Sequence, residues 1–185
     1  MTKHDLTLIA AQKNPKLPGE PFKARHLIDG QWHDSQDGTT FERHSPSHGI
    51  LVTHAAKGGV SETEQAISAA RQAFDDGRWS DIPGKDRSIL LLKVADLIDA
   101  NRERIALLET LESGKPISQA IAEIEGAADL WRYAAALART MHGDSHNALG
   151  KDMLGIVLKE PIGVASIITP WNFPFLIVSQ KLPFA

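Results

Sequence analysis

The carboxyl-terminal run of the chain, residues 160–185, constrains the fold more than any other segment; it reads EPIGVASIITPWNFPFLIVSQKLPFA. Residues 164–169 are apolar at positions that would face both sides of a strand, which is typical of a central parallel strand covered by helices. Pro170 and Pro174 bracket a short polar corner, and Pro174 suits the first turn of a helix. A buried strand, a corner and a helix in this order predict an α/β protein with a parallel sheet.

Short strands are expected near the amino terminus. Asp29 and Gly30 form a dipeptide that favours a two-residue hairpin turn between strands. A second hairpin is expected around the turn that contains Pro46 and Gly49. The predicted strand pairs are residues 26–28 with 31–32, and residues 39–43 with 50–55.

Three helices are expected after the strands, because apolar residues recur there at three- and four-residue intervals. Ser61 and Glu64 predict a capping box at the start of the first helix. The second helix is expected over residues 84–112, with Gly114 ending it. Pro116 lies near the first turn of the third helix, where its missing N–H costs nothing.

The composition is that of a globular protein, with 42% hydrophobic and 23% charged residues and a net charge of −3. No basic field attracts nucleic acid or an anionic membrane, and no apolar stretch approaches about eighteen residues. The sequence contains no Cys, which excludes disulfides, thiolate metal sites and a cysteine nucleophile within these residues. The amino-terminal residues carry too many charges for a signal peptide, so the cytoplasm is the expected compartment.

The corner holds the candidate catalytic residue, Asn172. In parallel α/β sheets, ligands bind outside the carboxyl ends of the strands, and this corner follows such an end. A carboxamide donates an N–H without carrying charge, which suits an oxyanion that develops only in the transition state. Two alternatives remain: Asn172 as a turn residue that bonds its own backbone, and Trp171 as a packing residue.

Several segments resemble the NAD(P)-dependent aldehyde dehydrogenase superfamily. They are EPIGV, ITPWNFP and KLP in the carboxyl-terminal run, LETLESGKP at residues 108–116, and IDGQW at residues 28–32. The resemblance extends from about His26 to Ala185 and corresponds to the amino-terminal part of such an enzyme. It implies a partial aldehyde dehydrogenase fold, with amino-terminal β-hairpins, three helices, oligomerisation-type strands and the first parallel strand of a Rossmann-like cofactor domain.

The resemblance also implies a domain division. Residues 1–24 would be a tail and linker, residues 25–143 and 161–185 an incomplete NAD(P)-binding domain, and residues 144–160 an oligomerisation-type strand extension. Strands of that type expose an edge, so the full-length form is expected to be a homodimer or homotetramer. The catalytic domain is missing from these residues, and we expect a truncated chain, with a genuine short protein as the alternative.

The family's site residues carry over to the carboxyl-terminal run. By resemblance, Asn172 supplies a side-chain N–H to an oxyanion hole, and Lys181 has a proton-relay or positioning role. The alternative for Lys181 is a solvated helix lysine. The cofactor, NAD or NADP, would lie against Ile168, Thr169, Pro170, Trp171 and Asn172.

The sequence contains two candidate metal sites. The resemblance implies a monovalent cation near Arg43, His44 and Glu112, although Glu112 could instead cap the helix end or form a salt bridge there. The histidines His44, His48 and His54 are clustered in the sequence, but no carboxylate pair near them has ligand spacing. The histidine site is therefore disfavoured.

The implied reaction oxidises an aldehyde to a carboxylic acid through a cysteine thiohemiacetal. The nucleophilic Cys and the general-base Glu lie further along the chain in such enzymes, so the 185 residues alone are expected to be inactive. The rival interpretation is a non-catalytic truncated relative that acts as an interaction module with full-length subunits.

Overall fold

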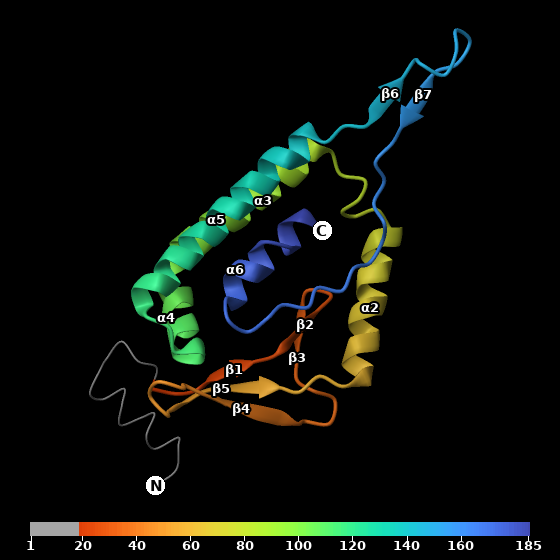
Figure 1. The fold of residues 1–185 in the computed structure, drawn as a ribbon. Coiled ribbons are helices and arrows are strands. Elements are labelled where there is room, and N and C mark those ends of the chain that lie inside the picture. Colours follow the sequence, from red (N-terminus) through yellow and green to blue (C-terminus); the bar gives the residue numbers. More distant parts are fainter. Residues whose placement is uncertain (1–18) are drawn as a thin grey trace.

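The computed structural model describes residues 19–185; two small sheets lie at one end, followed by long helices, and a third small sheet projects at the other end (Figure 1). The elements are β1 (Phe22–Ala24), β2 (His26–Ile28), β3 (Gln31–His33), β4 (Thr40–His44), β5 (Leu51–Ala56), α2 (Val60–Asp75), α3 (Gly84–Ala100), α4 (Arg102–Ser113), α5 (Ile117–Thr140), β6 (Asp144–His146), β7 (Gly155–Val157), α6 (Pro174–Ser179) and the 3₁₀ helix η1 (Leu182–Phe184).

The first predicted hairpin is confirmed. β2 and β3 pair in antiparallel register, and His26 lies opposite His33. Asp29 and Gly30 have φ values of 48° and 74°, so both adopt the left-handed conformation that a two-residue hairpin turn requires. This local backbone requirement is why the dipeptide was predictive.

The second predicted hairpin is also confirmed, as β4 and β5. A third strand, β1, pairs in parallel with β5 on its other side, so the sheet order is β1-β5-β4. The predicted linker was therefore wrong over residues 22–24, where Phe22 pairs with Thr53. Three residues carry too short a pattern to reveal a strand whose partner lies so far along the chain. Residues 1–18 of the predicted tail lie outside the described residues.

The start of α2 differs from the predicted capping box by two residues. The Gly59 backbone N–H donates to Glu62 Oε2 at 2.8 Å, whereas Ser61 and Glu64 were expected in these roles. Glu62 Oε1 also accepts from the Gln36 backbone N–H at 2.7 Å. Glu62 therefore binds the loop after β3 as well as the helix start. The capping pattern contains no information about this tertiary contact.

The predicted second helix is two helices, α3 and α4, separated at Asn101. The Asn101 backbone leaves the helical region, with φ −109° and ψ 10°, and its side-chain amide donates to the Leu97 carbonyl at 2.8 Å. The same carbonyl also accepts the Asn101 backbone N–H at 3.1 Å, so Asn101 closes the end of α3 with both its backbone and its side chain. Gly114 ends α4 in the left-handed conformation, as predicted.

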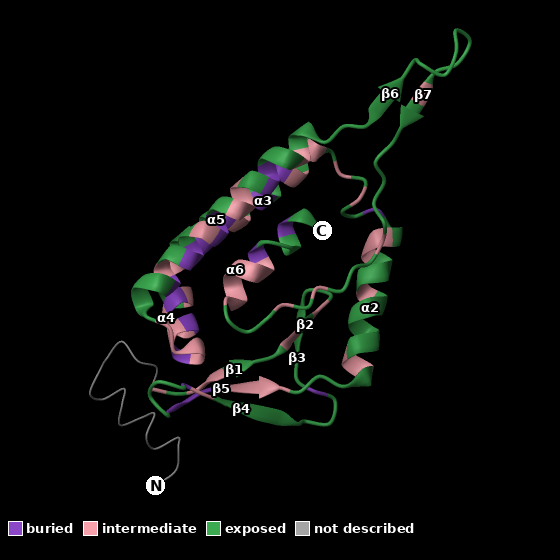
Figure 2. Ribbon diagram, viewed as in Figure 1, coloured by how far each residue is buried: buried purple, intermediate pink, exposed green. Residues whose placement is uncertain are grey.

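The core lies between the helices. Buried residues gather where α3, α4 and α5 face one another (Figure 2), and small residues of α5 allow the close approach. The principal cluster contains Ile98, Ala106, Ala120, Ile124 and Ala128, with Trp131 and Phe175 packed against it. A second cluster joins the sheet to α4 through Val52 and Leu111.

The predicted parallel strand at residues 164–169 is absent from the structure, where this segment has no regular secondary structure. Within residues 19–185, none of the strands pairs with it, and a strand without a neighbour leaves its backbone groups unpaired. Ile168 in this segment is 86% exposed. The helix after Pro174 is confirmed as α6, although it is shorter than the roughly three turns expected.

Two further features bear on function. β6 and β7 form a separate antiparallel hairpin that projects from the body (Figure 1), and it lies within the range predicted for an extension. Gly143 permits its close return, because a Cβ there would lie 1.9 Å from the Val157 carbonyl oxygen. Across residues 19–185, the helices fall short of the length and hydrophobicity needed to cross a bilayer.

The helical core gives a first prediction. Ile124 is fully buried, so Ile124→Ala should lower the free energy of unfolding by about 3 kcal/mol through lost burial and the cavity left behind. The matched control is Ile117→Ala in the same helix, where the side chain is 44% exposed and the loss should stay below about 1 kcal/mol. Urea denaturation measures both, and equal losses would contradict this account of the core.

Candidate functional site

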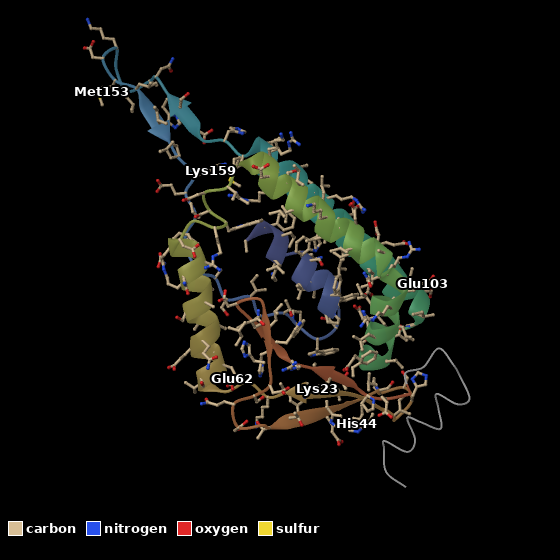
Figure 3. All side chains as sticks on the ribbon, turned by 180° about the vertical axis from the view of Figure 1, so that it is seen from behind. Lys23, His44, Glu62, Glu103, Met153 and Lys159 are labelled. Carbon is tan, nitrogen blue, oxygen red and sulfur yellow. The ribbon has the colours of Figure 1, made fainter. Side chains whose placement is uncertain are left out.

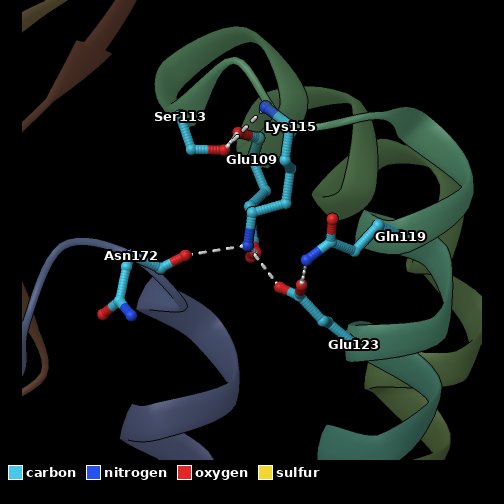
Figure 4. A network of polar contacts seen from close by, with 6 residues as sticks. All are labelled: Glu109, Ser113, Lys115, Gln119, Glu123 and Asn172. Carbon is cyan, nitrogen blue, oxygen red and sulfur yellow. Dashed lines mark hydrogen bonds and ion pairs between the residues drawn. The ribbon is translucent and has the colours of Figure 1, made fainter.

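The candidate site is the corner that precedes α6. Asn172 is exposed, and its carboxamide points away from the helices, whereas its backbone carbonyl points toward them (Figure 4). Phe173 follows, and its carbonyl accepts the first backbone bond of α6, from Ile177 at 2.9 Å. The corner therefore presents an uncharged N–H donor outward while its backbone faces the helical layer.

A buried ion cluster lies directly behind the corner. Lys115 Nζ donates to Glu109 Oε1 at 2.6 Å, to Glu123 Oε2, and to the Asn172 backbone carbonyl at 3.0 Å (Figure 4). The exposed fractions of the three side chains are 9% for Lys115, 3% for Glu109 and 7% for Glu123. All three donors of the ammonium are thus used, and one of them holds the corner.

Local structure explains how this cluster forms. Gly114 ends α4 with φ 79°, and the turn it makes places Lys115 between the end of α4 and the start of α5. Glu109 lies one turn before the end of α4, where Ser113 Oγ also donates to its backbone carbonyl at 2.6 Å. Glu123 lies in the second turn of α5. The two carboxylates therefore face the same lysine from successive helices.

The two carboxyl groups of the cluster differ in the direction of their pKa shifts. Burial raises the pKa of Glu109, and a hydrogen bond shared with Glu123 acts in the same direction. Glu109 Oε2 is buried without a donor, which also favours a protonated carboxyl group. Burial opposes ionisation of Glu123 too, but hydrogen bonds with Glu109, Lys115 and Gln119 hold its pKa below the ordinary value. The two carboxyl groups are therefore shifted in opposite directions, the pKa of Glu109 upward and that of Glu123 downward.

Two contacts extend the anchoring of α6. Lys115 Nζ lies 4.7 Å from the centroid of the Phe173 ring, within the range of a cation–π interaction. At the far end of α6, Trp131 Nε1 donates to the buried Ser179 Oγ at 3.1 Å. The helix that follows the corner is thus held at both ends by residues of the helical layer.

The predicted cofactor residues are consecutive in the segment that enters the corner. Ile168 and Trp171 are 86% and 85% exposed, Pro170 is exposed and Thr169 is half-buried. Exposed apolar surface beside an uncharged donor suits a planar, amide-bearing ring, so these residues fit the nicotinamide end of a dinucleotide. The assignment of each residue to the cofactor stays a prediction.

Lys181 is exposed and lies beyond the far end of α6, at the start of η1. Within the described part of the chain, no hydrogen bond joins its side chain to Asn172. Its predicted relay or positioning role therefore has no contact to support it at the corner, and the role stays a prediction.

The residues of the predicted cation site lie together, but another cation already neutralises the carboxylate. Arg43 Nε lies 3.2 Å from Glu112 Oε2, and Thr53 Oγ1 donates to Glu112 Oε1 at 2.5 Å. His44 Nε2 lies 3.3 Å from Glu42 Oε2. This is the salt bridge left open above as the alternative for Glu112, and a bound monovalent ion would compete with Arg43. The cation site stays a prediction.

The rival histidine site has no support. Over residues 19–185, no three side chains of His, Cys, Asp or Glu are grouped so that they could hold a metal ion.

Sequence reasoning missed the Lys115 cluster, although a signal was present. Glu109 and Glu123 both occupy positions that belong to buried helix faces, next to Ala106 and Ile124 in the helical repeat. A charged residue within an apolar stripe requires a buried partner of opposite charge. The nearest lysine between the two helices is Lys115.

The pKa of Glu109 gives a second prediction. A carboxyl group whose folded pKa is raised above its ordinary value of 4.5 favours folding below that value, and this contribution is lost as the pH rises through the folded pKa. Glu109→Gln keeps the neutral form at every pH. Relative to the unaltered chain, the variant should therefore gain in free energy of unfolding as the pH rises above 4.5 and through the folded pKa of Glu109.

The control for this experiment is Glu103→Gln in the same helix. Glu103 lies on the outer surface (Figure 3), so its substitution should shift stability only slightly over this pH range. Chemical denaturation at several pH values measures both variants. A Glu109→Gln chain whose relative stability falls with rising pH would contradict the assignment.

Comparison with known proteins identifies the family. The model of the aldehyde dehydrogenase family matches residues 32–185. Aldehyde dehydrogenase family 2 member B4, mitochondrial, of Arabidopsis thaliana is 42% identical over 157 residues, which are 84% of this chain and 29% of that protein. The compartment of this chain stays a prediction, because its relatives include mitochondrial plant proteins and bacterial proteins.

Comparison with solved structures gives the same family. An NAD-dependent aldehyde dehydrogenase from Sinorhizobium meliloti is 49% identical with a TM-score of 0.85, over 88% of this chain and 33% of that one. An NADP-dependent enzyme from E. coli is 34% identical with a TM-score of 0.82, over 86% and 33%. The chain thus spans about a third of the length of these relatives. It belongs to the aldehyde dehydrogenase family.

Proposed function

We propose that this chain forms the amino-terminal part of an NAD(P)-dependent enzyme that oxidises an aldehyde to a carboxylic acid. The observation that carries the proposal is the exposed carboxamide of Asn172 in a corner whose backbone is bound by Lys115 at 3.0 Å. An uncharged donor on an anchored backbone, in the same segment as the apolar Ile168 and Trp171, supports an oxyanion site next to a nicotinamide ring.

The proposed mechanism assigns one step to this chain. A cysteine thiolate outside these 185 residues adds to the aldehyde carbonyl, and the carbonyl oxygen becomes negatively charged. Asn172 donates its side-chain N–H to that oxygen and stabilises the transition state by about 3 kcal/mol, as single oxyanion donors do. NAD(P)⁺, when bound, supplies the hydride acceptor for the oxidation. Hydrolysis of the resulting thioester releases the acid.

Within this mechanism, the neighbours of Asn172 bind the cofactor and exclude water from the site. Ile168 and Trp171 would contact the nicotinamide ring, and Thr169 and Pro170 would set the backbone path between them. Pro170 lacks a backbone N–H, so it adds no competing donor beside Asn172.

The test is a fused polypeptide in which residues 1–185 precede the remaining part of the Sinorhizobium meliloti enzyme. Asn172→Ala should lower kcat about 10²- to 10³-fold with little change in KM, because the lost bond forms mainly in the transition state. Reduction of NAD⁺ or NADP⁺ with a simple aldehyde is the measurement. The 185-residue chain without the fused part should give no such reduction.

The control is Gln180→Ala, which removes an exposed carboxamide at the end of α6, and it should leave kcat unchanged. Activity of the isolated chain, or equal effects of the two substitutions, would sink the proposed role of Asn172.

The exposed β6–β7 hairpin supports the proposal that the complete enzyme forms a homo-oligomer. A two-stranded hairpin is marginally stable in water, and this one exposes apolar side chains along its length, with Met153 at its outer end (Figure 3). The exposed apolar residues are Leu149, Met153, Leu154, Ile156, Val157 and Leu158. We propose that the hairpin pairs with another subunit, in a homodimer or homotetramer of the complete enzyme.

The same observation favours a second candidate function: a non-catalytic module that pairs with full-length subunits. The two candidates differ in activity, since only the first requires aldehyde oxidation by the fused polypeptide. They share the interface.

Ile156→Lys tests that interface. A charge at this exposed position of β7 should dissociate the oligomer, since burying an unpaired ammonium in a subunit contact is costly. Sedimentation velocity of the fused polypeptide measures its mass. The control is Val60→Lys, at another exposed apolar position, which should leave the mass unchanged. A monomeric unaltered protein would refute the interface.

A further inference from the structure

We propose that Lys115 is a positioning residue for the corner: its ammonium fixes the backbone carbonyl of Asn172 and thereby aims the carboxamide of Asn172. What Asn172 does once aimed rests on the proposed function. How firmly Asn172 is positioned does not depend on that function and can be measured without an activity assay.

The geometry of the ammonium makes it a fixed point. Two of its donors bind Glu109 and Glu123, which belong to α4 and α5. With the nitrogen held between two helices, the third donor has one direction left, and it binds the Asn172 carbonyl at 3.0 Å. That carbonyl carbon is bonded to the Cα that carries the carboxamide, so fixing the carbonyl restricts where the side chain can point.

The surroundings of the corner make this bond important. Residues 158–170 have no regular secondary structure, and Trp171 is almost fully exposed. Regular backbone bonding resumes only where Ile177 donates to the Phe173 carbonyl. Lys115 binds at the junction, through the carbonyl of Asn172 and across the ring of Phe173. An exposed segment thus obtains its rigidity from a buried side chain.

The charge of Lys115 strengthens the bond. A hydrogen bond whose donor is ionised is roughly twice as strong as one between two neutral groups. Lys115 is only 9% exposed. A neutral donor would hold the carbonyl less firmly.

The competing explanation is that Lys115 serves only to pack α4 against α5. Lys115→Met alone cannot separate the two, because it leaves Glu109 and Glu123 as uncompensated buried carboxylates and destabilises the fold. The decisive variant therefore combines Lys115→Met with Glu109→Gln and Glu123→Gln. This neutral variant removes the unpaired charges while the bond to Asn172 stays lost. Replacing buried ion clusters by neutral groups is often tolerated.

The measurement is NMR relaxation of the 15N-labelled 185-residue chain. In the unaltered protein, the backbone amide of Phe173 should have an order parameter of about 0.85, typical of rigid backbone. In the neutral variant it should fall below about 0.6, with the same loss at the side-chain amide of Asn172, while the amides of α5 stay rigid. Glu109→Gln, which keeps Lys115 and its bond to Asn172, is the matched control and should retain the rigid value.

A second measurement needs no variant. The Phe173 ring lies 4.7 Å from the ammonium, so ring currents should shift the Lys115 side-chain protons upfield, with nuclear Overhauser contacts to the ring. Absence of these contacts in the unaltered chain overturns the proposal, whether or not the neutral variant folds. A Phe173 amide that stays rigid in a folded neutral variant overturns it as well.

These outcomes are distinct from a failure of the proposed function. If the corner loosens but Asn172→Ala leaves kcat of the fused polypeptide unchanged, then Lys115 positions a residue without a catalytic role. If the corner stays rigid but Asn172→Ala lowers kcat, then the oxyanion donor is correct and is positioned by other groups.

Discussion

A single ammonium group, that of Lys115, connects the helical layer to the corner. Lys115 joins the end of α4, the start of α5 and the corner that leads into α6, three parts of the chain that share no backbone pairing. Burying one cation with two carboxylates is costly unless the charges balance. Here burial raises the pKa of Glu109, so this carboxyl group gives up its negative charge more readily than an exposed glutamate does.

The helical layer supplies the rigidity that the corner lacks. α3 and α5 pack through small residues, such as Ala128 and Ala135, which bring the two helices close together. Ser179 and Asn172 are then bound from this layer by Trp131 and Lys115. Packing that contains no reactive group therefore determines where the candidate catalytic amide lies.

Local chemistry explains which elements could be predicted from the sequence. Gly30 and Gly114 permit the left-handed backbone that a turn and a helix end require, and Pro174 fixes its own φ; the turn, helix end and helix start at these sites are confirmed. The predictions failed where a distant partner decides the outcome. β1 exists because β5 lies beside it, and residues 164–169 form no strand because none of the described strands lies beside them.

The candidate site likewise contains one residue that the local sequence identifies and one that distant packing positions. Asn172 could be identified from the corner itself, because the prolines and the motif are local. For the lysine that supports it, the family resemblance favoured Lys181, which is nine residues away and exposed. The lysine in contact with Asn172 is Lys115, 57 residues earlier, because its position is determined by helix packing and by two carboxylates on different helices. A glutamate in an apolar helix face requires a cation nearby, and this requirement points to Lys115. Distance along the chain carries no such information.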